Sequence, residues 1–320
     1  MKSKAKVVSL FTGCGGSDSG LAALGFEVVF ANDIMPYARD LYLANLPETD
    51  YRLDYRLDDV RKIKSFPAVE LLVGCYPCQG FSQAGARVAN RNINYLYQEF
   101  DRALRAIRPK AFIVENVAGM FRSDSARLLN NQLVRFRSAG YFVNHQLLNA
   151  ADFGVAQDRR RIFIVGIRSD FGIRYEFPEP THGAGRKKPV KTIADALDGM
   201  PEWPEGEFVD AKFHWYYMSR NRRRGWDEPS RTIVSKAQHV PIHPMSPELL
   251  YVRPDVWKWS SDAPKRRFSY REAARLQGFK KNLRFPDTES GILRNRYKVI
   301  GNAVPPPLFK AVAGALPDVW

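Results

Sequence analysis

A thiol, a carboxylate and a glycine-rich turn each follow a short apolar run in this chain of 320 residues. Cys78 comes shortly after Leu71–Val73, Glu115 directly follows Phe112–Val114, and the glycines of Phe11–Gly16 follow the first apolar run. Such runs predict buried strands, and open α/β sheets bind their ligands at the carboxyl ends of strands. These residue types suggest nucleophilic catalysis beside a bound cofactor.

Short apolar runs alternate with helical patterns through the first half of the chain. The predicted strands are Val7–Phe11, Phe26–Ala31, Leu71–Val73, Ala111–Val114, Phe142–Leu148 and Arg161–Ile167. The predicted helices are 17–24, with Ser17 or Asp18 as the cap, and Pro36–Asn45, Tyr95–Ile107 and Ser125–Ser138. This alternation predicts an α/β fold with a Rossmann-like, mostly parallel sheet and helices on both faces.

The pattern changes after about Gly172, where prolines, aromatic and basic residues mix without periodicity. Helical periodicity returns at Tyr270–Leu276, and Pro307–Leu316 predicts a last short helix. A smaller, irregular domain is therefore expected in the second half of the chain.

Charge and cysteine content narrow the class of protein. The formal net charge is +15, which favours a polyanionic partner such as nucleic acid, although a solvated basic surface is the alternative. Three cysteines argue against a disulfide framework and for a reducing compartment. No apolar run approaches the roughly 20 residues that span a membrane. We therefore expect a cytoplasmic protein without a membrane partner.

The glycine turn predicts a cofactor site. Gly13-x-Gly15-Gly16 lets the backbone approach a ligand closely. Asp33 ends the second predicted strand, about twenty residues downstream, where an acid can bind ribose hydroxyls. A nicotinamide dinucleotide would prefer Gly-x-Gly-x-x-Gly. The alternative role of Asp33 is that of a helix cap.

Six motifs in this order make the chain resemble the bacterial DNA (cytosine-5) methyltransferases. They are Phe11–Gly16, Pro77-Cys78-Gln79, Glu115-Asn116-Val117, Gln157-x-Arg159-x-Arg161, Arg271–Phe279 and Gly301–Pro305. The resemblance covers almost the whole chain. It implies transfer of a methyl group from S-adenosylmethionine to carbon 5 of cytosine in a specific duplex DNA sequence, with S-adenosylhomocysteine as the product.

The resemblance assigns catalytic roles to five residues. Cys78 would add to carbon 6 of a cytosine flipped out of the duplex, and Glu115 would act near ring nitrogen 3. Asn116 would hold the Glu115 loop, Arg161 would contact the cytosine oxygen, and Arg159 would support the cysteine loop.

Cys75 complicates this assignment in two ways. Cys75-x-x-Cys78 also fits a redox motif or half of a zinc site, but no further ligands complete a metal site, and we predict no metal. The resembled family usually has glycine at the position of Cys75, so the local backbone is expected to differ.

The resemblance also places binding residues. The cofactor pocket would be lined by Phe11, Thr12, Gly13, Gly15, Asp33, Ile34, Asp59, Val60, Pro77, Leu96, Asn302 and Ala303, with Asp58 or Asp54 as alternatives to Asp59. Gln79 to about Asn94 would close over the flipped base, with Gln79, Ser82, Arg87 and Arg91 contacting DNA. The expected phosphate contacts in the second half are Arg220, Arg222, Arg223, Arg224 and Thr232, for which a solvated surface is the alternative.

The implied organisation is a catalytic domain at 1–172 completed by 296–320, a target-recognition domain at 173–268 and a connecting region at 269–295. We expect a monomer in the bacterial cytoplasm, associated with the nucleoid and serving a restriction or phage-defence system. The alternatives are a transfer-RNA cytosine methylase, a non-catalytic DNA-binding relative and, more remotely, an oxidoreductase.

Overall fold

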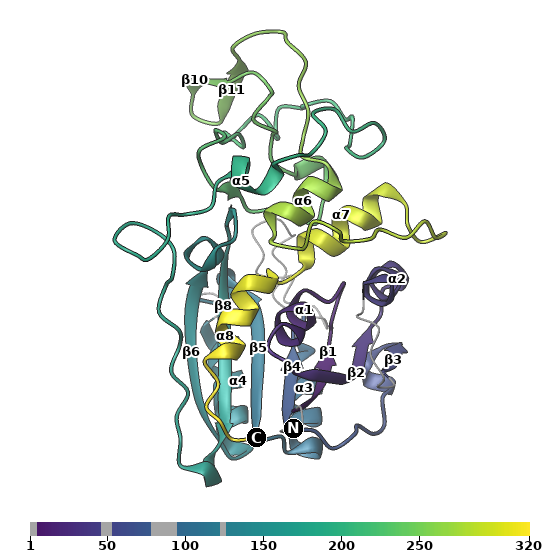
Figure 1. The fold of residues 1–320 in the computed structure, drawn as a ribbon, viewed down its shortest axis with the longest axis vertical. Coiled ribbons are helices and arrows are strands. Elements are labelled where there is room, and N and C mark those ends of the chain that lie inside the picture. Colours follow the sequence, from purple (N-terminus) through teal and green to yellow (C-terminus); the bar gives the residue numbers. More distant parts are fainter. Residues whose placement is uncertain (1–4, 46–52, 78–94, 122–125) are drawn as a thin grey trace. The chain divides into compact units, whose positions relative to one another are not determined.

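The computed structural model describes residues 5–45, 53–77, 95–121 and 126–320, which fold into two compact units (Figure 1). The first unit contains Met1–Asn149, Arg160–Glu179 and Pro306–Trp320. The second contains Ala150–Arg159 and Pro180–Pro305. No helix in the described ranges is long and apolar enough to cross a membrane.

A seven-stranded sheet forms the centre of the first unit, in the order β3-β2-β1-β4-β5-β8-β6. Its strands are β1 (Lys6–Leu10), β2 (Glu27–Asp33), β3 (Asp54–Leu57), β4 (Leu71–Gly74), β5 (Ala111–Val117), β6 (Tyr141–Asn149) and β8 (Arg160–Arg168). The first five are parallel, and β8 runs antiparallel to both β5 and β6. The carboxyl ends of β1, β2, β4 and β5 therefore lie at one edge of the sheet.

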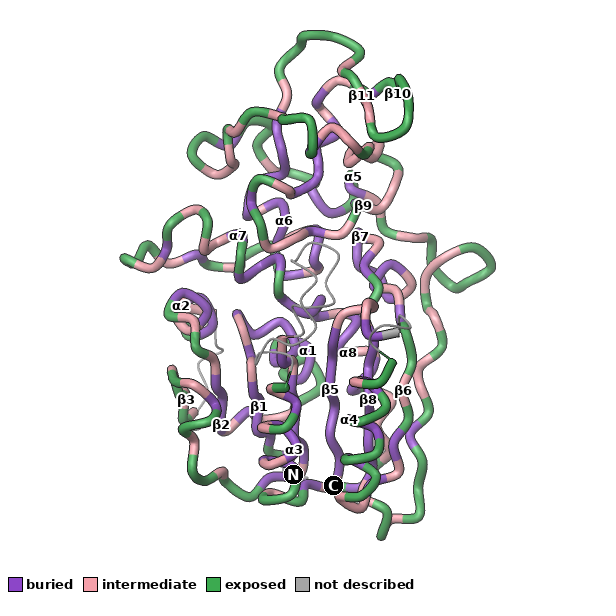
Figure 2. The backbone as a smooth tube through the Cα atoms, turned by 180° about the vertical axis from the view of Figure 1, so that it is seen from behind, coloured by how far each residue is buried: buried purple, intermediate pink, exposed green. Residues whose placement is uncertain are grey.

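Helices cover both faces of this sheet, which confirms the predicted fold class (Figures 1 and 2). They are α1 (Gly16–Ala22), α2 (Pro36–Ala44), α3 (Tyr97–Ile107), α4 (Ala126–Ser138) and α8 (Pro306–Gly314). Alternate strand residues face opposite layers: Phe112 contacts Phe100 and Phe136 of α3 and α4, whereas Phe163 contacts Phe309 of α8. The central strands are almost fully buried, and this explains their continuous apolar sequences.

The last helix packs closely on the first one. A Cβ at Gly20 of α1 would lie 2.8 Å from the carbonyl oxygen of Pro306, so only glycine permits this approach. Tyr175 adds a hydrogen bond from its hydroxyl to the Val312 carbonyl oxygen at 2.8 Å. The carboxyl-terminal helix thus belongs to the first unit.

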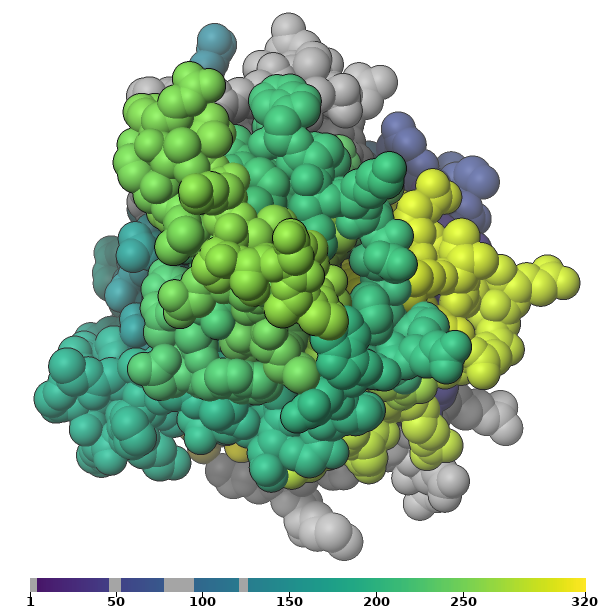
Figure 3. Space-filling model, turned by 90° about the horizontal axis from the view of Figure 1, so that it is seen from above, coloured from purple at the N-terminus to yellow at the C-terminus, as the bar shows by residue number. Residues whose placement is uncertain are grey.

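The second unit has little regular structure. It contains α5 (Ile193–Leu197), α6 (Tyr270–Leu276) and α7 (Leu293–Asn302), the parallel pair β7 (Gln157–Asp158) and β9 (Ser230–Arg231), and the antiparallel hairpin β10 (Leu249–Arg253) and β11 (Val256–Trp259). Figure 3 shows one face of its surface, in green shades. Inside this unit, buried Arg266 pairs with Glu272 of α6 through two hydrogen bonds at 2.8 and 2.7 Å.

The compact units differ from the predicted ranges at several segments, of which residues 173–179 belong to the first unit although they fall within the predicted range 173–268. Residues 150–159 belong to the second unit, although they fall within the predicted range 1–172. Residues 296–305 also belong to the second unit, because α7 contacts α6 there. The assignment of catalysis and target recognition to separate domains stays a prediction.

Candidate active site

The glycine turn after β1 has an unusual backbone. Phe11 has a φ of 58°, Gly13 of 56° and Gly15 of 81°. A bulky residue such as Phe11 rarely adopts this conformation, and such strain gathers at functional sites. A Cβ on Gly13 would have no described atom within 4 Å, so the turn borders open space, whereas one on Gly15 would lie 2.9 Å from the Tyr42 ring.

The start of α1 differs from the prediction. Gly15 occupies the N-cap position without a side-chain cap, so neither Ser17 nor Asp18 caps this helix. Asp18 is instead buried, and its carboxylate accepts hydrogen bonds from Ser9 at 2.7 Å and Tyr42 at 2.8 Å. Burial raises the pKa of Asp18, and these hydroxyl groups oppose the shift. The carboxylate therefore fixes the glycine turn to β1 and α2.

Asp33 ends β2 beside this turn. Its carboxylate accepts the N–H of Gly13 at 2.9 Å and the N–H of Met35 at 2.8 Å. The first bond joins the acid to the glycine turn, and the second orders the start of α2. One carboxylate thus fixes the turn and the helix entry together, and its contact with ribose hydroxyls stays a prediction.

The end of β3 distinguishes the three candidate acids. Asp54 begins β3 at the opposite end from Asp33, whereas Asp58 and Asp59 follow its carboxyl end. The Arg61 side chain lowers the pKa of Asp59 to about 2, so this carboxylate is charged. Buried Asn32, which the sequence analysis missed, donates to the carbonyl oxygens of residues 56 and 58, both at 2.9 Å.

The other predicted lining residues differ in their surroundings. Ile34 is 64% exposed, and Val60 is buried. Thr12 is buried and donates its N–H to the Asn32 carbonyl oxygen, while Leu96 packs against the core and Pro77 is half-buried. Asn302 is exposed and Ala303 is buried, and both belong to the second unit.

Glu115 and Arg161 form a buried ion pair in the first unit. Glu115 lies within β5 and is 7% exposed. Arg161 lies on β8 opposite Val117, and its Nε is 3.0 Å from Glu115 Oε1. Burial lowers the pKa of Arg161, and the neighbouring carboxylate opposes this shift. The pair brings together two residues predicted to act on one ring.

Asn116 holds the turn that precedes Cys78. Its side-chain amide donates to the Tyr76 carbonyl oxygen at 3.0 Å, and its own oxygen accepts the Val117 N–H at 2.8 Å. The Cys75 N–H donates to the Leu10 carbonyl oxygen at 3.2 Å. The backbone of residues 75 and 76, which leads to Cys78, is therefore held by hydrogen bonds to β1 and β5. Outside the described residues lie Cys78 itself and four predicted DNA contacts, Gln79, Ser82, Arg87 and Arg91.

The two cysteines that the structure describes are poor nucleophiles. Cys14 is buried, and burial raises its pKa to about 12. Burial also raises the pKa of Cys75 well above its ordinary value, and the Glu115 carboxylate adds to this increase. A thiol is reactive only as the thiolate, so both cysteines are inert near neutral pH.

We therefore predict that N-ethylmaleimide at pH 7.5 labels Cys78 alone in the folded protein. With a pKa of about 12, the thiolate fraction of Cys14 is on the order of 10⁻⁵. Peptide mass spectrometry before and after unfolding in urea measures the labelling. Labelling of Cys75 as fast as that of Cys78 in the folded protein would contradict this prediction.

Arg159 and Gln157 connect distant segments of the chain inside the second unit. Its guanidinium donates to the carbonyl oxygens of Ile233, Gly301 and Ala303, each at 2.9 Å. Gln157 accepts the Ile233 N–H at 2.9 Å and donates to Gln277, so the network includes α6. The predicted support of the cysteine loop by Arg159 lies outside the described residues.

Most arginines of the basic cluster at residues 220–224 bind acceptors of their own unit. Arg222 donates to the Tyr217 carbonyl oxygen at 2.9 Å, and Arg224 pairs with Glu228. Arg223 donates to the carbonyl oxygens of residues 246 and 244 at 3.0 and 2.8 Å. Three guanidinium groups thus bind the unit's own acceptors, and only Arg220 is exposed. The sequence shows the charges but not the acceptors that engage them.

Thr232 is also engaged within the second unit. Its hydroxyl donates to the Asp158 carbonyl oxygen at 2.7 Å. A hydroxyl has a single proton to donate, so this arrangement provides none for a phosphate. The residue instead joins the strand pair β7 and β9.

We predict that Arg223→Ala destabilises the second unit, whereas Arg220→Ala does not. Loss of Arg223 leaves two backbone acceptors without their donor, which costs about 1–3 kcal/mol each. The midpoint of thermal unfolding should fall by about 5–10 °C. Scanning fluorimetry of both variants measures this, and equal midpoints would contradict the structural role of Arg223.

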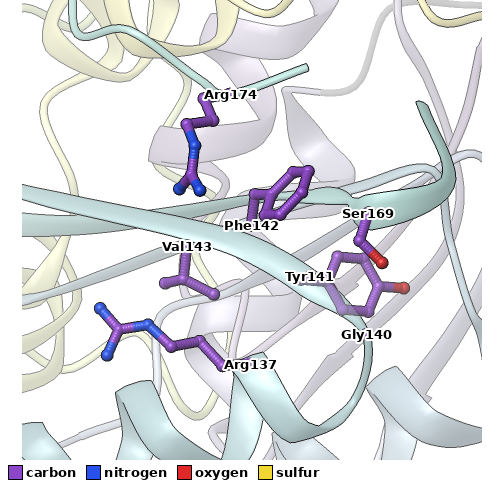
Figure 4. A pocket seen from close by; sticks show the side chains of 7 residues that line it. All are labelled: Arg137, Gly140, Tyr141, Phe142, Val143, Ser169 and Arg174. Carbon is purple, nitrogen blue, oxygen red and sulfur yellow. The ribbon is translucent and has the colours of Figure 1, made fainter. Parts of the chain in front are cut away.

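A shallow pocket of the first unit lies away from these residues (Figure 4). It is lined by Arg137, Gly140, Tyr141, Phe142, Val143, Ser169 and Arg174. Tyr141 begins β6, so the pocket lies at the amino ends of the parallel strands, opposite the glycine turn. None of the predicted site residues lines it, and Arg174 packs over the Phe142 ring at 4.5 Å.

Comparison with known proteins identifies the family. Residues 5–318 match the model of the family described as C-5 cytosine-specific DNA methylase. The Type II methyltransferase M.BsuRI of Bacillus subtilis is 35% identical over 98% of this chain and 79% of its own length. M.BspRI of Lysinibacillus sphaericus, also a Type II methyltransferase, is 35% identical over 98% of this chain and 81% of its own length.

A solved structure has the same fold. It is a DNA modification methyltransferase encoded within an Escherichia coli prophage, with a TM-score of 0.69 and 21% identity over 98% of this chain and 99% of its own. The family match and the two relatives extend over nearly the whole chain. The chain therefore belongs to the C-5 cytosine-specific DNA methylase family and is an enzyme of that family.

Proposed function

We propose that this enzyme transfers a methyl group from S-adenosylmethionine to carbon 5 of a cytosine flipped out of duplex DNA, through a covalent adduct with Cys78. The observation that carries the proposal is the buried Glu115–Arg161 pair. Glu115 lies on β5, and the next residue of that strand, Asn116, anchors the turn that leads to Cys78. A thiol, a carboxylate and a cation can thereby act on one ring.

The glycine turn suits the cofactor. Open space beside Gly13, the strained backbone of Phe11 and the fixed carboxylate of Asp33 fit a ligand with ribose hydroxyls. Asp59 follows the neighbouring strand and would meet the adenine amino group. When bound, S-adenosylmethionine supplies the methyl group from its sulfonium.

The chain's own residues would then activate the cytosine. The Cys78 thiolate forms a bond to carbon 6, and the electron pair of the carbon 5–carbon 6 double bond moves toward carbon 5. Glu115 stabilises the ring by a hydrogen bond or proton at nitrogen 3, and Arg161 would contact the cytosine carbonyl oxygen. After methyl transfer to carbon 5, loss of the carbon 5 proton restores the double bond and expels the thiolate.

Duplex DNA is the substrate that the relatives favour over transfer RNA. The relatives at 35% identity are named Type II methyltransferases, and the family model is that of a DNA methylase. A base within a duplex must be extruded before a side chain reaches its ring. A restriction or phage-defence system would use such methylation to mark the DNA of its own bacterial cell. We place the enzyme in the cytoplasm, with the nucleoid.

The experiment compares DNA and transfer RNA as substrates side by side. Purified protein with S-adenosylmethionine should place 5-methylcytosine in duplex DNA, and bisulfite sequencing should locate it in one sequence context. Methylation of transfer RNA alone would contradict the DNA proposal. Absence of methyl transfer to either substrate would contradict catalysis.

A further inference from the structure

Three adjacent rings of the second unit are presented to solvent. Trp215 is 81% exposed, the largest exposed fraction among the large apolar side chains that the structure describes. Tyr216 is 45% exposed, and His214 is also exposed. We call residues 214–216 the aromatic turn. The Tyr216 ring also contacts His239, with 5.7 Å between centroids. Exposed apolar groups gathered in this way mark binding surfaces.

The aromatic turn has a rigid base. The Met218 N–H closes it by donating to the His214 carbonyl oxygen at 3.1 Å. Tyr217 is fully buried, and its hydroxyl donates to the Val240 carbonyl oxygen at 2.7 Å. Tyr217 packs with Phe213 and with hairpin residues in a small core. A turn whose backbone is held in place before binding loses little backbone entropy when it contacts a ligand.

The charge around the aromatic turn favours a polyanion. From Ala211 to Trp226 the chain has five basic residues and no acidic one. Lys212 and Arg220, on either side of the turn, are exposed, and so is Lys236, which precedes His239. Positive charge beside exposed rings is the arrangement that binds nucleic acids through phosphates and stacked bases.

The β10–β11 hairpin provides a contrast within the same unit. Tyr251 is 60% exposed there. However, Glu248, Asp255 and Asp262 lie on or beside the hairpin together with Arg253, Lys258 and Lys265, so acidic and basic residues balance there. Without an excess of positive charge, an exposed ring is less suited to a phosphate backbone.

We propose that the aromatic turn contacts the bases of the target DNA, with Trp215 inserted at a base step of the duplex, where it stacks on a base that has lost its neighbour, and with Lys212, Arg220 and Lys236 near phosphates. This inference rests on the proposed function, because it assigns the DNA contact of that reaction. It separates base contact, which Trp215 makes, from backbone contact, which the exposed cations make.

The test uses a duplex of about 25 base pairs that contains the site mapped by bisulfite sequencing of DNA methylated by the wild type. Trp215→Ala should weaken binding and lower kcat/KM by about 5- to 150-fold, the loss of one stacked base. The DNA affinity of Trp215→Ala should fall with salt concentration as steeply as that of the wild type. For Arg220→Ala, the slope of the logarithm of the binding constant against the logarithm of the salt concentration should be smaller by about one unit. The unfolding midpoint should not change, because the indole is exposed.

Conservative variants separate stacking from general apolar contact. Trp215→Phe should recover most of the binding, and Trp215→Leu should not. Tyr251→Ala is the matched control and should bind like the wild type. Wild-type binding by Trp215→Ala, or equal recovery by leucine and phenylalanine, would overturn the proposal.

Two further outcomes would have different meanings for the proposal. A change in oligomeric state of Trp215→Ala with unchanged kcat/KM would identify a protein interface and overturn the proposal. Failure of the wild type to form 5-methylcytosine would instead refute the proposed function, and it is measured before any variant.

Discussion

Cys78→Ser is expected to abolish methyl transfer while binding of S-adenosylmethionine is retained. A serine hydroxyl is far less acidic than a thiol and is a weak nucleophile for attack on carbon 6. The rate should fall by a factor on the order of 10⁴ or more. Incorporation of a labelled methyl group into duplex DNA measures this loss.

Two controls make the result specific. Equilibrium dialysis should show cofactor binding within about threefold of the wild type, because the glycine turn and Asp33 are unchanged. The unfolding midpoint should also be retained. Turnover within tenfold of the wild type would remove Cys78 from the mechanism.

Glu115→Gln is expected to lower the rate by about 10²- to 10⁴-fold, because the ring loses its acid. The amide can still accept a hydrogen bond from Arg161, so the site should keep its shape better than with alanine. Removing one partner of a buried ion pair nevertheless leaves the other charge uncompensated, which costs about 3–5 kcal/mol. The rate must therefore be measured well below the unfolding midpoint of the variant.

Glu99→Gln is the matched control for this prediction. Glu99 pairs with Arg102 on α3 of the same unit, and the two side chains are 23% and 39% exposed. Partly exposed pairs contribute little, so both the rate and the stability should be close to those of the wild type. Equal rates of the Glu115 and Glu99 variants would contradict a chemical role of Glu115.

The fold was predictable where burial on both faces leaves continuous apolar runs. The parallel strands β1, β2, β4 and β5 each carry such a run, and the helix Tyr270–Leu276 was predicted with its observed bounds. The short edge strand Asp54–Leu57 was missed, because its alternating polar residues resemble a loop. The helix Leu293–Asn302 was missed, because its buried stripe is short and interrupted by charged residues.

The site was predictable only as far as residue types indicate chemistry. The acid after Val114 and the glycines after β1 were found from the sequence, but the buried amides of Asn32 and Gln132 were not. Their partners are backbone and hydroxyl groups far away in the chain, and such pairing leaves no sequence pattern. For the same reason, the sequence did not show the carbonyl groups and the carboxylate that bind Arg222, Arg223 and Arg224, and the phosphate contact of these arginines stays a prediction.

The measurement that tests the central claim most directly uses a duplex with 5-fluorocytosine at the mapped target position. Fluorine cannot leave as a proton does, so the adduct should persist after methyl transfer. A denaturing gel should show a protein–DNA complex that depends on S-adenosylmethionine, and mass spectrometry should locate the modified base on Cys78. No complex with a preparation that methylates ordinary DNA, or attachment at Cys14 or Cys75, would contradict the account.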